Sequence, residues 1–243
     1  RPTRTAAGAG AGVRQIDQGL RSYMNKVYAT MSVGMLITFA VAWAVGTSPQ
    51  LLAVFRDPMT LQPNILGWIV MFAPLIMVFA FSAMINKLSA VAAQTFFYAF
   101  AAVMGLSLSW IFVAFTGFSI AQVFLVTSIA FAGLSLFGYT TKKDISGWGS
   151  FLIMGVIGLV VASIVNIFLG SPAIMFAISI LGVLIFAGLT AYDTQKIKQV
   201  YIQHAAHGDQ EWLAKSAIMG ALNLYLDFIN MFMFLLQLMG NRE

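Results

Sequence analysis

Long stretches with almost no charge constrain this chain more than any other feature of its sequence. A membrane-spanning helix needs about 20 consecutive, mainly apolar residues. Three of the stretches are long enough for one such helix each and two are long enough for two, which predicts seven transmembrane helices. The stretches are residues 27–55, 58–86, 88–141, 145–192 and 216–241, the last of which contains one charge, at Asp227.

Two turns divide the longer stretches into pairs of helices. Residues 116–119 (TGFS) and 170–172 (GSP) have the composition of turns, and Pro172 suits the first position of a helix. The sequence therefore predicts an all-α polytopic membrane protein. Its spans are expected near residues 27–46, 65–85, 94–115, 119–140, 149–169, 172–193 and 220–239.

The composition agrees with a chain whose main solvent is the lipid bilayer. Hydrophobic residues make up 60% of the 243 residues and charged residues only 9%, whereas soluble domains carry about 25% charged residues. This balance excludes a water-soluble globular enzyme. The absence of cysteine excludes a disulfide scaffold, a thiolate zinc site and a cysteine nucleophile.

The basic residues lie almost entirely on one side of the predicted membrane. When seven spans are counted, only Arg56 and Arg242 of the 13 lysine and arginine residues fall on the other side. Cytoplasmic loops are enriched in these residues, so we expect a cytoplasmic N-terminus and an outer C-terminus. The lack of cysteine and of a cleavable signal pattern fits a multi-pass protein of a bacterial inner membrane.

Residues 1–23 form a basic tail that is rich in glycine and alanine. Such a segment has too little apolar surface to offset the entropy of ordering, so we expect it to be disordered. The seven-helix domain is expected to occupy residues 24–243.

Two carboxylates are expected within the membrane. Counting back from the polar C-terminal end places Asp227 about five residues, or roughly 7 Å, inside the seventh helix, and Asp193 ends the sixth helix. Both then lie in the cytoplasmic third of the bilayer, where a charged side chain is costly and usually faces the bundle interior. Two such carboxylates tend to share one proton and to titrate as a pair.

Other polar residues support this site. Asn223 and Asn230 lie four residues before and three residues after Asp227, so the three form one stripe on a helix that is otherwise apolar. A helix of this kind is typical of the centre of a bundle, which predicts that the seventh helix is central. Asn166 is a further polar residue within a span, and Lys87 is the nearest cation that could reach the aspartates.

Three segments resemble the Bax inhibitor-1 family, which is also called the transmembrane Bax inhibitor motif family. They are residues 191–198 (AYDTQKIK), 222–230 (LNLYLDFIN) and 98–105. The resemblance extends over the whole seven-span region. It implies a seven-helix fold with the seventh helix central, a pH-sensitive aspartate pair on the cytoplasmic side and a slow calcium leak. Asp193 and Asp227 would be the pair.

The resemblance also assigns a role to Lys87. This residue stands where relatives can place an arginine that latches the closed form. A lysine lacks the two-pronged geometry of arginine, so a differently tuned latch is expected. The second span contains no carboxylate, although one would favour the passage of a divalent ion.

The leading hypothesis is a membrane calcium leak channel that is gated by a proton shared between Asp193 and Asp227. Calcium prefers several oxygen ligands, and the two carboxylates, with Asn223 and Asn230, would offer a transient site. The expected partners are membrane lipids and calcium as the permeant ion. No cofactor, no nucleic acid and no enzymatic activity are expected.

Two other functions are compatible with the sequence. The protein could regulate a membrane protein partner, such as a membrane protease, and its basic loops could bind acidic partners or anionic lipids. Paired aspartates on adjacent helices also occur in intramembrane aspartyl proteases. Those enzymes carry Gly-x-Gly-Asp on the later helix, whereas Tyr225 and Leu226 precede Asp227 here, so proteolysis is the weaker hypothesis.

The loop between the sixth and seventh spans contains both histidines of the chain. His204, His207 and Asp209 have a spacing that can bind a metal. No further histidine or cysteine exists to complete zinc coordination, so we expect an exposed polar loop.

Overall fold

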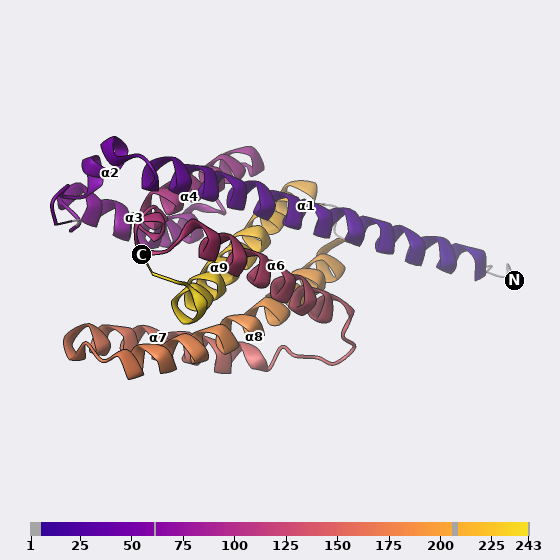
Figure 1. Ribbon diagram of the computed structural model, residues 1–243. Coiled ribbons are helices and arrows are strands. Elements are labelled where there is room, and N and C mark those ends of the chain that lie inside the picture. Colours follow the sequence, from indigo (N-terminus) through magenta and orange to yellow (C-terminus); the bar gives the residue numbers. More distant parts are fainter. Residues whose placement is uncertain (1–5, 61, 206–208, 243) are drawn as a thin grey trace, which may run out of the picture.

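The structure is a computed structural model that describes residues 6–60, 62–205 and 209–242, and these residues form a bundle of helices (Figure 1). The helices in the described residues are α1 (Ala6–Gly46), α2 (Pro49–Phe55), α3 (Ile65–Met84), α4 (Ala90–Leu108), α5 (Ile111–Ala114), α6 (Gly117–Thr140), α7 (Trp148–Leu169), α8 (Pro172–His204) and α9 (Gln210–Met239).

The prediction of seven membrane-spanning helices is confirmed. Seven segments of the described chain are long and apolar enough to cross a membrane. Helices α4 and α5 together form one of them, Ala90–Ala114, and the short helix α2 lies outside the spans. The chain is therefore an all-α polytopic membrane protein.

Helices α8 and α9 are longer than the sequence predicted. We expected the sixth span to end at Asp193, but α8 continues to His204, so the aspartate lies inside the helix. That expectation was wrong because a helix need not stop where its sequence becomes charged once it leaves the lipid. Helix α9 begins ten residues before the predicted start of its span, after Asp209, whose side chain accepts a hydrogen bond from the backbone N–H of Trp212 at 2.9 Å.

The N-terminal tail also differs from the expectation. Helix α1 begins at Ala6, so residues 6–23 are helical where we expected disorder, and residues 1–5 lie outside the described residues. Alanine has the highest helix propensity of all residues. A helix that is already formed in the first span also extends without a new nucleation step.

Polar caps begin most of the helices. In each case an oxygen of the residue before the helix accepts a hydrogen bond from a backbone N–H in the first turn, which satisfies a donor that the helix itself leaves free. The two predicted turns are of this kind: Thr116 caps α6 and Ser171 caps α8. Gly170 adopts a left-handed φ of 60° after α7, a conformation that glycine adopts without strain.

Helix α9 is the centre of the bundle, as predicted. It packs against α8, α1, α6 and α4, and Figure 1 shows it, in yellow, between the other helices. In its most apolar window 61% of the residues are buried, compared with at most 33% in any other span. Helices α7 and α3 lie at the periphery, where α7 packs on α8 and α3 packs on α4 and α2.

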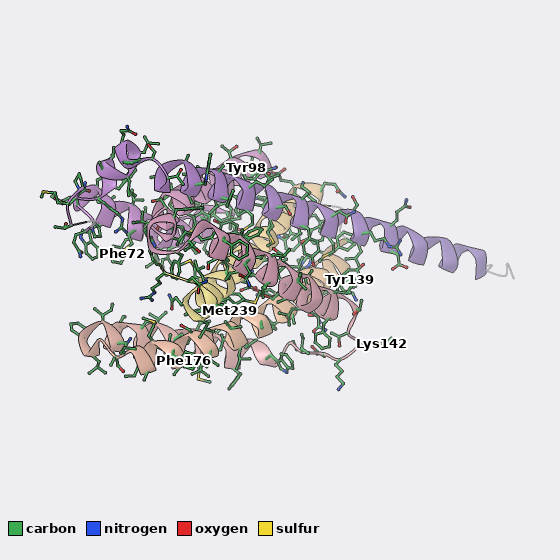
Figure 2. All side chains as sticks on the ribbon, viewed as in Figure 1. Phe72, Tyr98, Tyr139, Lys142, Phe176 and Met239 are labelled. Atoms are coloured by element: carbon green, nitrogen blue, oxygen red, sulfur yellow. The ribbon has the colours of Figure 1, made fainter. Side chains whose placement is uncertain are left out.

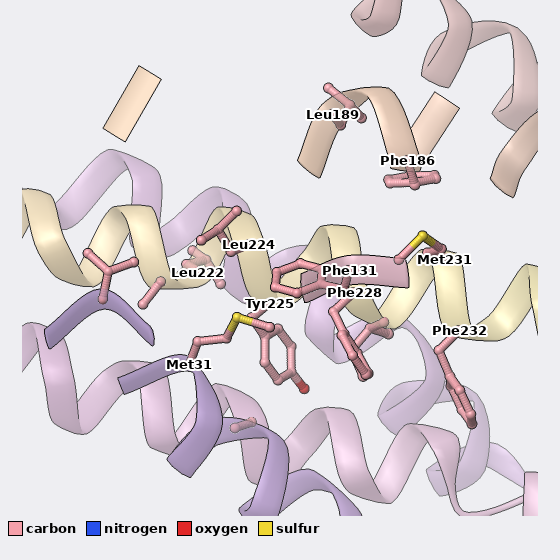
Figure 3. Close-up of a cluster of buried hydrophobic side chains, with 14 of the residues drawn as sticks. Met31, Phe131, Phe186, Leu189, Leu222, Leu224, Tyr225, Phe228, Met231 and Phe232 are labelled. Atoms are coloured by element: carbon pink, nitrogen blue, oxygen red, sulfur yellow. The ribbon is translucent and has the colours of Figure 1, made fainter. Parts of the chain in front are cut away.

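Aromatic rings from α9 fill the space around it (Figure 3). The ring of Phe228 meets Phe124 and Phe131 of α6 edge-on, with centroids 5.4 and 5.5 Å away. The ring of Tyr225 meets Phe97 and Phe100 of α4, at 5.6 and 5.7 Å. Edge-to-face pairs add to the burial of apolar area, so these two rings hold α9 against α4 and α6.

The two ends of the bundle differ. Figure 2 shows Tyr139 and Lys142 at the end where α1 projects from the bundle. The C-terminus lies at the other end, where the backbone N–H of Thr116 donates to the carbonyl oxygen of Asn241 at 3.1 Å. The termini are thus separated by the thickness of the bundle, as an odd number of spans requires. A cytoplasmic N-terminus stays a prediction.

Candidate functional site

Asp193 of α8 and Asp227 of α9 face each other across the interface between their helices. Their carboxyl groups are close enough to form a side-chain hydrogen bond with each other. Asp193 is 9% exposed and Asp227 only 4%. The structure thus brings together the two aspartates that the sequence singled out.

A regular spacing of residues creates this contact. On α9, Gly220, Asp227 and Phe234 are seven residues apart, so they lie on one face of the helix. On α8, Gly182 precedes Asp193 by 11 residues, or about three turns, and shares its face. A side chain at Gly182 would collide with the ring of Phe234, so the missing side chain lets α8 and α9 approach closely about three turns from Asp193, on the face that carries the pair.

The chemistry of the pair follows from its hydrogen bonds. Ionised carboxylates only accept hydrogen bonds, so two of them can be joined directly only if one carries a proton. Oδ2 of Asp227 is buried and has no hydrogen-bond partner among the described residues. Two full charges about 4 Å apart would repel each other by about 4 kcal/mol near a protein surface. A single shared proton removes this repulsion.

Tyr225 fixes the opposite face of α9. Its hydroxyl lies 2.6 Å from Oγ1 of Thr38 in α1, and Thr38 in turn donates to the carbonyl oxygen of Ala101 in α4 at 2.8 Å. Because Thr38 has only one proton to donate, the hydroxyl of Tyr225 must be the donor to Thr38. This chain joins three helices on the side of α9 that faces away from Asp193.

A second chain of hydroxyl groups begins beside Asp193. Thr194 donates to the carbonyl oxygen of Thr190 at 2.7 Å, so it accepts from Ser135 of α6, which lies 2.9 Å away. Ser135 therefore has no proton left for Tyr28 of α1, and Tyr28 donates to Ser135 at 2.5 Å. The oxygen of Tyr28 accepts no hydrogen bond within the described part of the chain.

The predicted supporting residues occupy different places. Asn223 and Asn230 are half-buried on α9, and Asn230 donates to the carbonyl oxygen of Leu226 at 2.8 Å. Asn166 lies at the end of α7, where its side chain accepts from the backbone N–H of Ser171 at 3.1 Å. That turn is about 32 Å from the level of Asp193 along α8, so Asn166 holds the helix connection and does not reach the aspartate pair.

Lys87 does not reach the pair in this structure. It follows α3, its side chain is exposed, and that side chain makes no ion pair or hydrogen bond with any residue that the structure describes. The cation that acts on Asp193 is Lys196, three residues further along α8. Sequence reasoning missed it, although a separation of three residues on a helix places two side chains on one face.

Gln195 is another residue that the sequence did not indicate. Its side chain accepts from the backbone N–H of Ile145 at 2.9 Å and donates to the carbonyl oxygen of Lys143 at 2.8 Å. The loop between α6 and α7 is thereby attached to α8, two residues after Asp193. The residue belongs to the segment AYDTQKIK, so a glutamine within that segment was the available signal.

In the connection between α8 and α9, His204 takes part in packing between the two helices. The ring of His204 stacks on Trp212, with centroids 4.1 Å apart, and links the end of α8 to the start of α9. His207 lies outside the described residues. In the described ranges no three residues of the histidine, cysteine, aspartate and glutamate types gather into a metal site. A calcium ion at the pair would need amide, carbonyl or water oxygens as further ligands.

Comparison with known proteins identifies one family and several bacterial relatives of this chain. The sequence model of the family described as "Inhibitor of apoptosis-promoting Bax1" matches residues 20–243. The inner membrane protein YbhL of Escherichia coli is 47% identical over 93% of this chain and 94% of its own length. An uncharacterized protein of Caulobacter vibrioides is 45% identical over 94% of this chain and 92% of its own length. The protein YrjE of Lactococcus lactis is 38% identical over 93% of each.

The predicted localisation is also supported. The relative from Escherichia coli is named an inner membrane protein, and this chain has seven helices in its described part that are long enough to span the bilayer. The chain is a multi-pass protein of the bacterial inner membrane.

Proposed function

Because the chain belongs to the Bax inhibitor-1 family of membrane proteins, we propose that it is a calcium leak channel gated by the pair Asp193 and Asp227. The observation that carries the proposal is the direct contact of two buried carboxyl groups between two spanning helices. Ionisable residues inside a membrane are costly and usually mark an ion or proton pathway.

The gate works through the packing of α8 against α9. When one proton is shared, the two carboxyl groups are hydrogen-bonded and the helices stay together. When that proton is lost, two charges face each other in a buried interface, and their repulsion favours separation of the helices. A rise in pH therefore opens the gate, and a fall in pH closes it.

Calcium would meet suitable ligands at the opened gate. Both aspartates would then be ionised and would offer carboxylate oxygens, which calcium prefers over nitrogen or sulfur. Among the described residues only two carboxylates lie at this point, so the site would bind the ion weakly and release it, as conduction requires.

The test is calcium flux into dye-loaded liposomes that contain the purified protein, from pH 6 to pH 8. The flux through the unmodified protein should rise with pH. Asp227→Asn places a neutral amide, which donates hydrogen bonds, against Asp193. This variant should keep the helices together and give a low flux that no longer depends on pH.

Asp17→Asn is the matched control, because Asp17 is an exposed aspartate of α1 that makes no hydrogen bond or ion pair within the described residues. It should leave the pH dependence unchanged. Flux with the same pH profile in the Asp227→Asn variant would remove the pair from the gate. No flux above that of empty liposomes would reject the channel, and a regulatory protein with a membrane partner would then be the leading proposal.

The packing around Asp227 favours a gate over a protease. A peptide substrate needs open space beside a catalytic aspartate. Asp227 itself is only 4% exposed, and Phe228, the next residue on α9, is also 4% exposed, so the described residues leave little open space at the aspartate. Cleavage of a helical membrane substrate that either aspartate variant abolishes would reverse this conclusion.

A further inference from the structure

A long groove between α1 and α6 is not used by the proposed gate. Its volume is about 1370 Å³, which exceeds the 300–1,000 Å³ of typical small-molecule pockets. The backbones of the two helices are not closely packed against each other, and Phe228 of α9 contributes to the lining. The groove extends along α6 from Gly117 to Tyr139, or roughly 33 Å, which is about the thickness of the hydrocarbon core of a bilayer.

The wall that α1 contributes changes from charged to apolar along its length. Arg21, Asn25 and Tyr28 line the groove at the basic end of the bundle, and they share one face of the helix because they are four and three residues apart. Beyond them the lining from α1 is mostly apolar, through Met31 and Met35 to Phe39. A cationic group is thus followed by an amide, a hydroxyl and an apolar wall.

This order matches the groups of an anionic phospholipid. Arg21 and Tyr28 are about 10 Å apart along the helix, slightly more than the headgroup and interfacial layer on one side of a bilayer, about 5–8 Å. Tyr28 and Phe39 are about 16 Å apart, which is close to half of the hydrocarbon core, the depth that one leaflet of acyl chains fills. Methionine side chains are flexible and fit the irregular surface of an acyl chain.

The polar groups at the head of the groove are available to a ligand. The guanidinium of Arg21 is exposed and makes no ion pair or hydrogen bond with a described residue. Tyr28 donates its proton to Ser135, which leaves its oxygen as an acceptor at the groove. Asp17, the nearest acidic residue on α1, lies one turn beyond Arg21 and is not part of the lining.

We propose that the groove between α1 and α6 binds one anionic phospholipid, with its phosphate at Arg21 and its acyl chains along the apolar wall of α1 as far as Phe39. The lipid would cover the side of α6 that carries Ser135. The hydroxyl of Ser135 donates a hydrogen bond to Thr194, the residue after Asp193.

The test measures lipid bound to the detergent-solubilised protein by native mass spectrometry, with phosphatidylglycerol and phosphatidylcholine of the same acyl chains. The unmodified protein should bind phosphatidylglycerol in a one-to-one complex, in preference to phosphatidylcholine. Arg21→Gln should reduce the binding of phosphatidylglycerol roughly five-fold, as expected for one basic residue near an anionic headgroup. Lys26→Gln removes an exposed cation of α1 outside the groove and should leave the binding unchanged.

A second pair of variants tests the location. Ala132 of α6 lines the groove, whereas Ala130 is exposed on the same helix outside it. Ala132→Phe should block the bound lipid and Ala130→Phe should not. Equal loss in Arg21→Gln and Lys26→Gln, equal loss in the two alanine variants, or equal binding of the two lipids would overturn the proposal. So would a dimer that Ala132→Phe dissociates, because the groove would then hold a second copy of the chain.

Discussion

At the scale of single residues, residues 224–227 (LYLD) of α9 make contacts on two different faces of the helix. Asp227 meets Asp193 on α8, whereas Tyr225 donates a hydrogen bond to Thr38 on the other side of α9. The carboxylate was recognisable in the sequence because a charge inside an apolar helix stands out. The partner of Tyr225 was not recognisable, since Thr38 is 187 positions away and threonine is common in spanning helices.

The hydrogen bond between Tyr225 and Thr38 gives an asymmetric prediction. Tyr225→Phe removes the donor and leaves Thr38 bonded to Ala101, so the cost should be about 0.6 kcal/mol, the average for a hydrogen bond between membrane helices. Thr38→Val leaves the hydroxyl of Tyr225 buried without a partner and should cost about 1–3 kcal/mol. The free energy of unfolding in detergent measures both. If Tyr225→Phe were the more costly change, the assigned donor would be wrong.

At the scale of the elements, α6 packs closely against the part of α8 that carries Asp193, and this packing helps to position the aspartate pair. Gly138 of α6 packs directly against the backbone carbonyl of Ala191 in α8, two residues before Asp193. The bond between Ser135 and Thr194 crosses the same interface, at 2.9 Å. The pair is therefore held in place by three helices, although its residues come from two.

A methyl group at Gly138 should weaken this interface. Gly138→Ala would force its Cβ into the carbonyl oxygen of Ala191, and overpacking of this kind costs about 1–3 kcal/mol. Gly133→Ala is the matched control on the same helix, because a Cβ there meets nothing within 4 Å and alanine favours a helix over glycine. The midpoint of thermal unfolding should fall for the first variant and stay the same or rise for the second. Equal shifts would show that the close approach is not needed.

The membrane spans were predictable in number, but the lengths of their helices were less so. Apolar composition marks the part of a helix that lies in lipid, so all seven spans were found from the gaps between charges. It says nothing about the turns beyond the membrane, which explains why α8 extends 11 residues past Asp193 and why Lys196 was overlooked. Lys87 was chosen by its position in the sequence, and only the folded chain shows that it is exposed, without an ion pair to any described carboxylate.

At the scale of the whole molecule, the bundle has one strongly basic end. The starts of α1 and α9 and the ends of α3, α6 and α8 carry most of the lysine and arginine residues of the chain, whereas Arg56 and Arg242 stand at the other end. An asymmetry of this kind sets the orientation of a membrane protein during insertion. It also places both the aspartate pair and the head of the α1–α6 groove nearer to the basic end.

The orientation can be measured directly because the chain contains no cysteine, so a single introduced thiol is the only one present. Met59 is 94% exposed in the turn between α2 and α3, and Lys142 is exposed after α6 at the opposite end. With the basic end in the cytoplasm, a membrane-impermeant maleimide added to intact spheroplasts should label Met59→Cys and should label Lys142→Cys only after lysis. The unmodified chain is the control and should stay unlabelled. Labelling of Lys142→Cys before lysis, with Met59→Cys protected, would place the N-terminus outside, and the aspartate pair would then respond to the external pH.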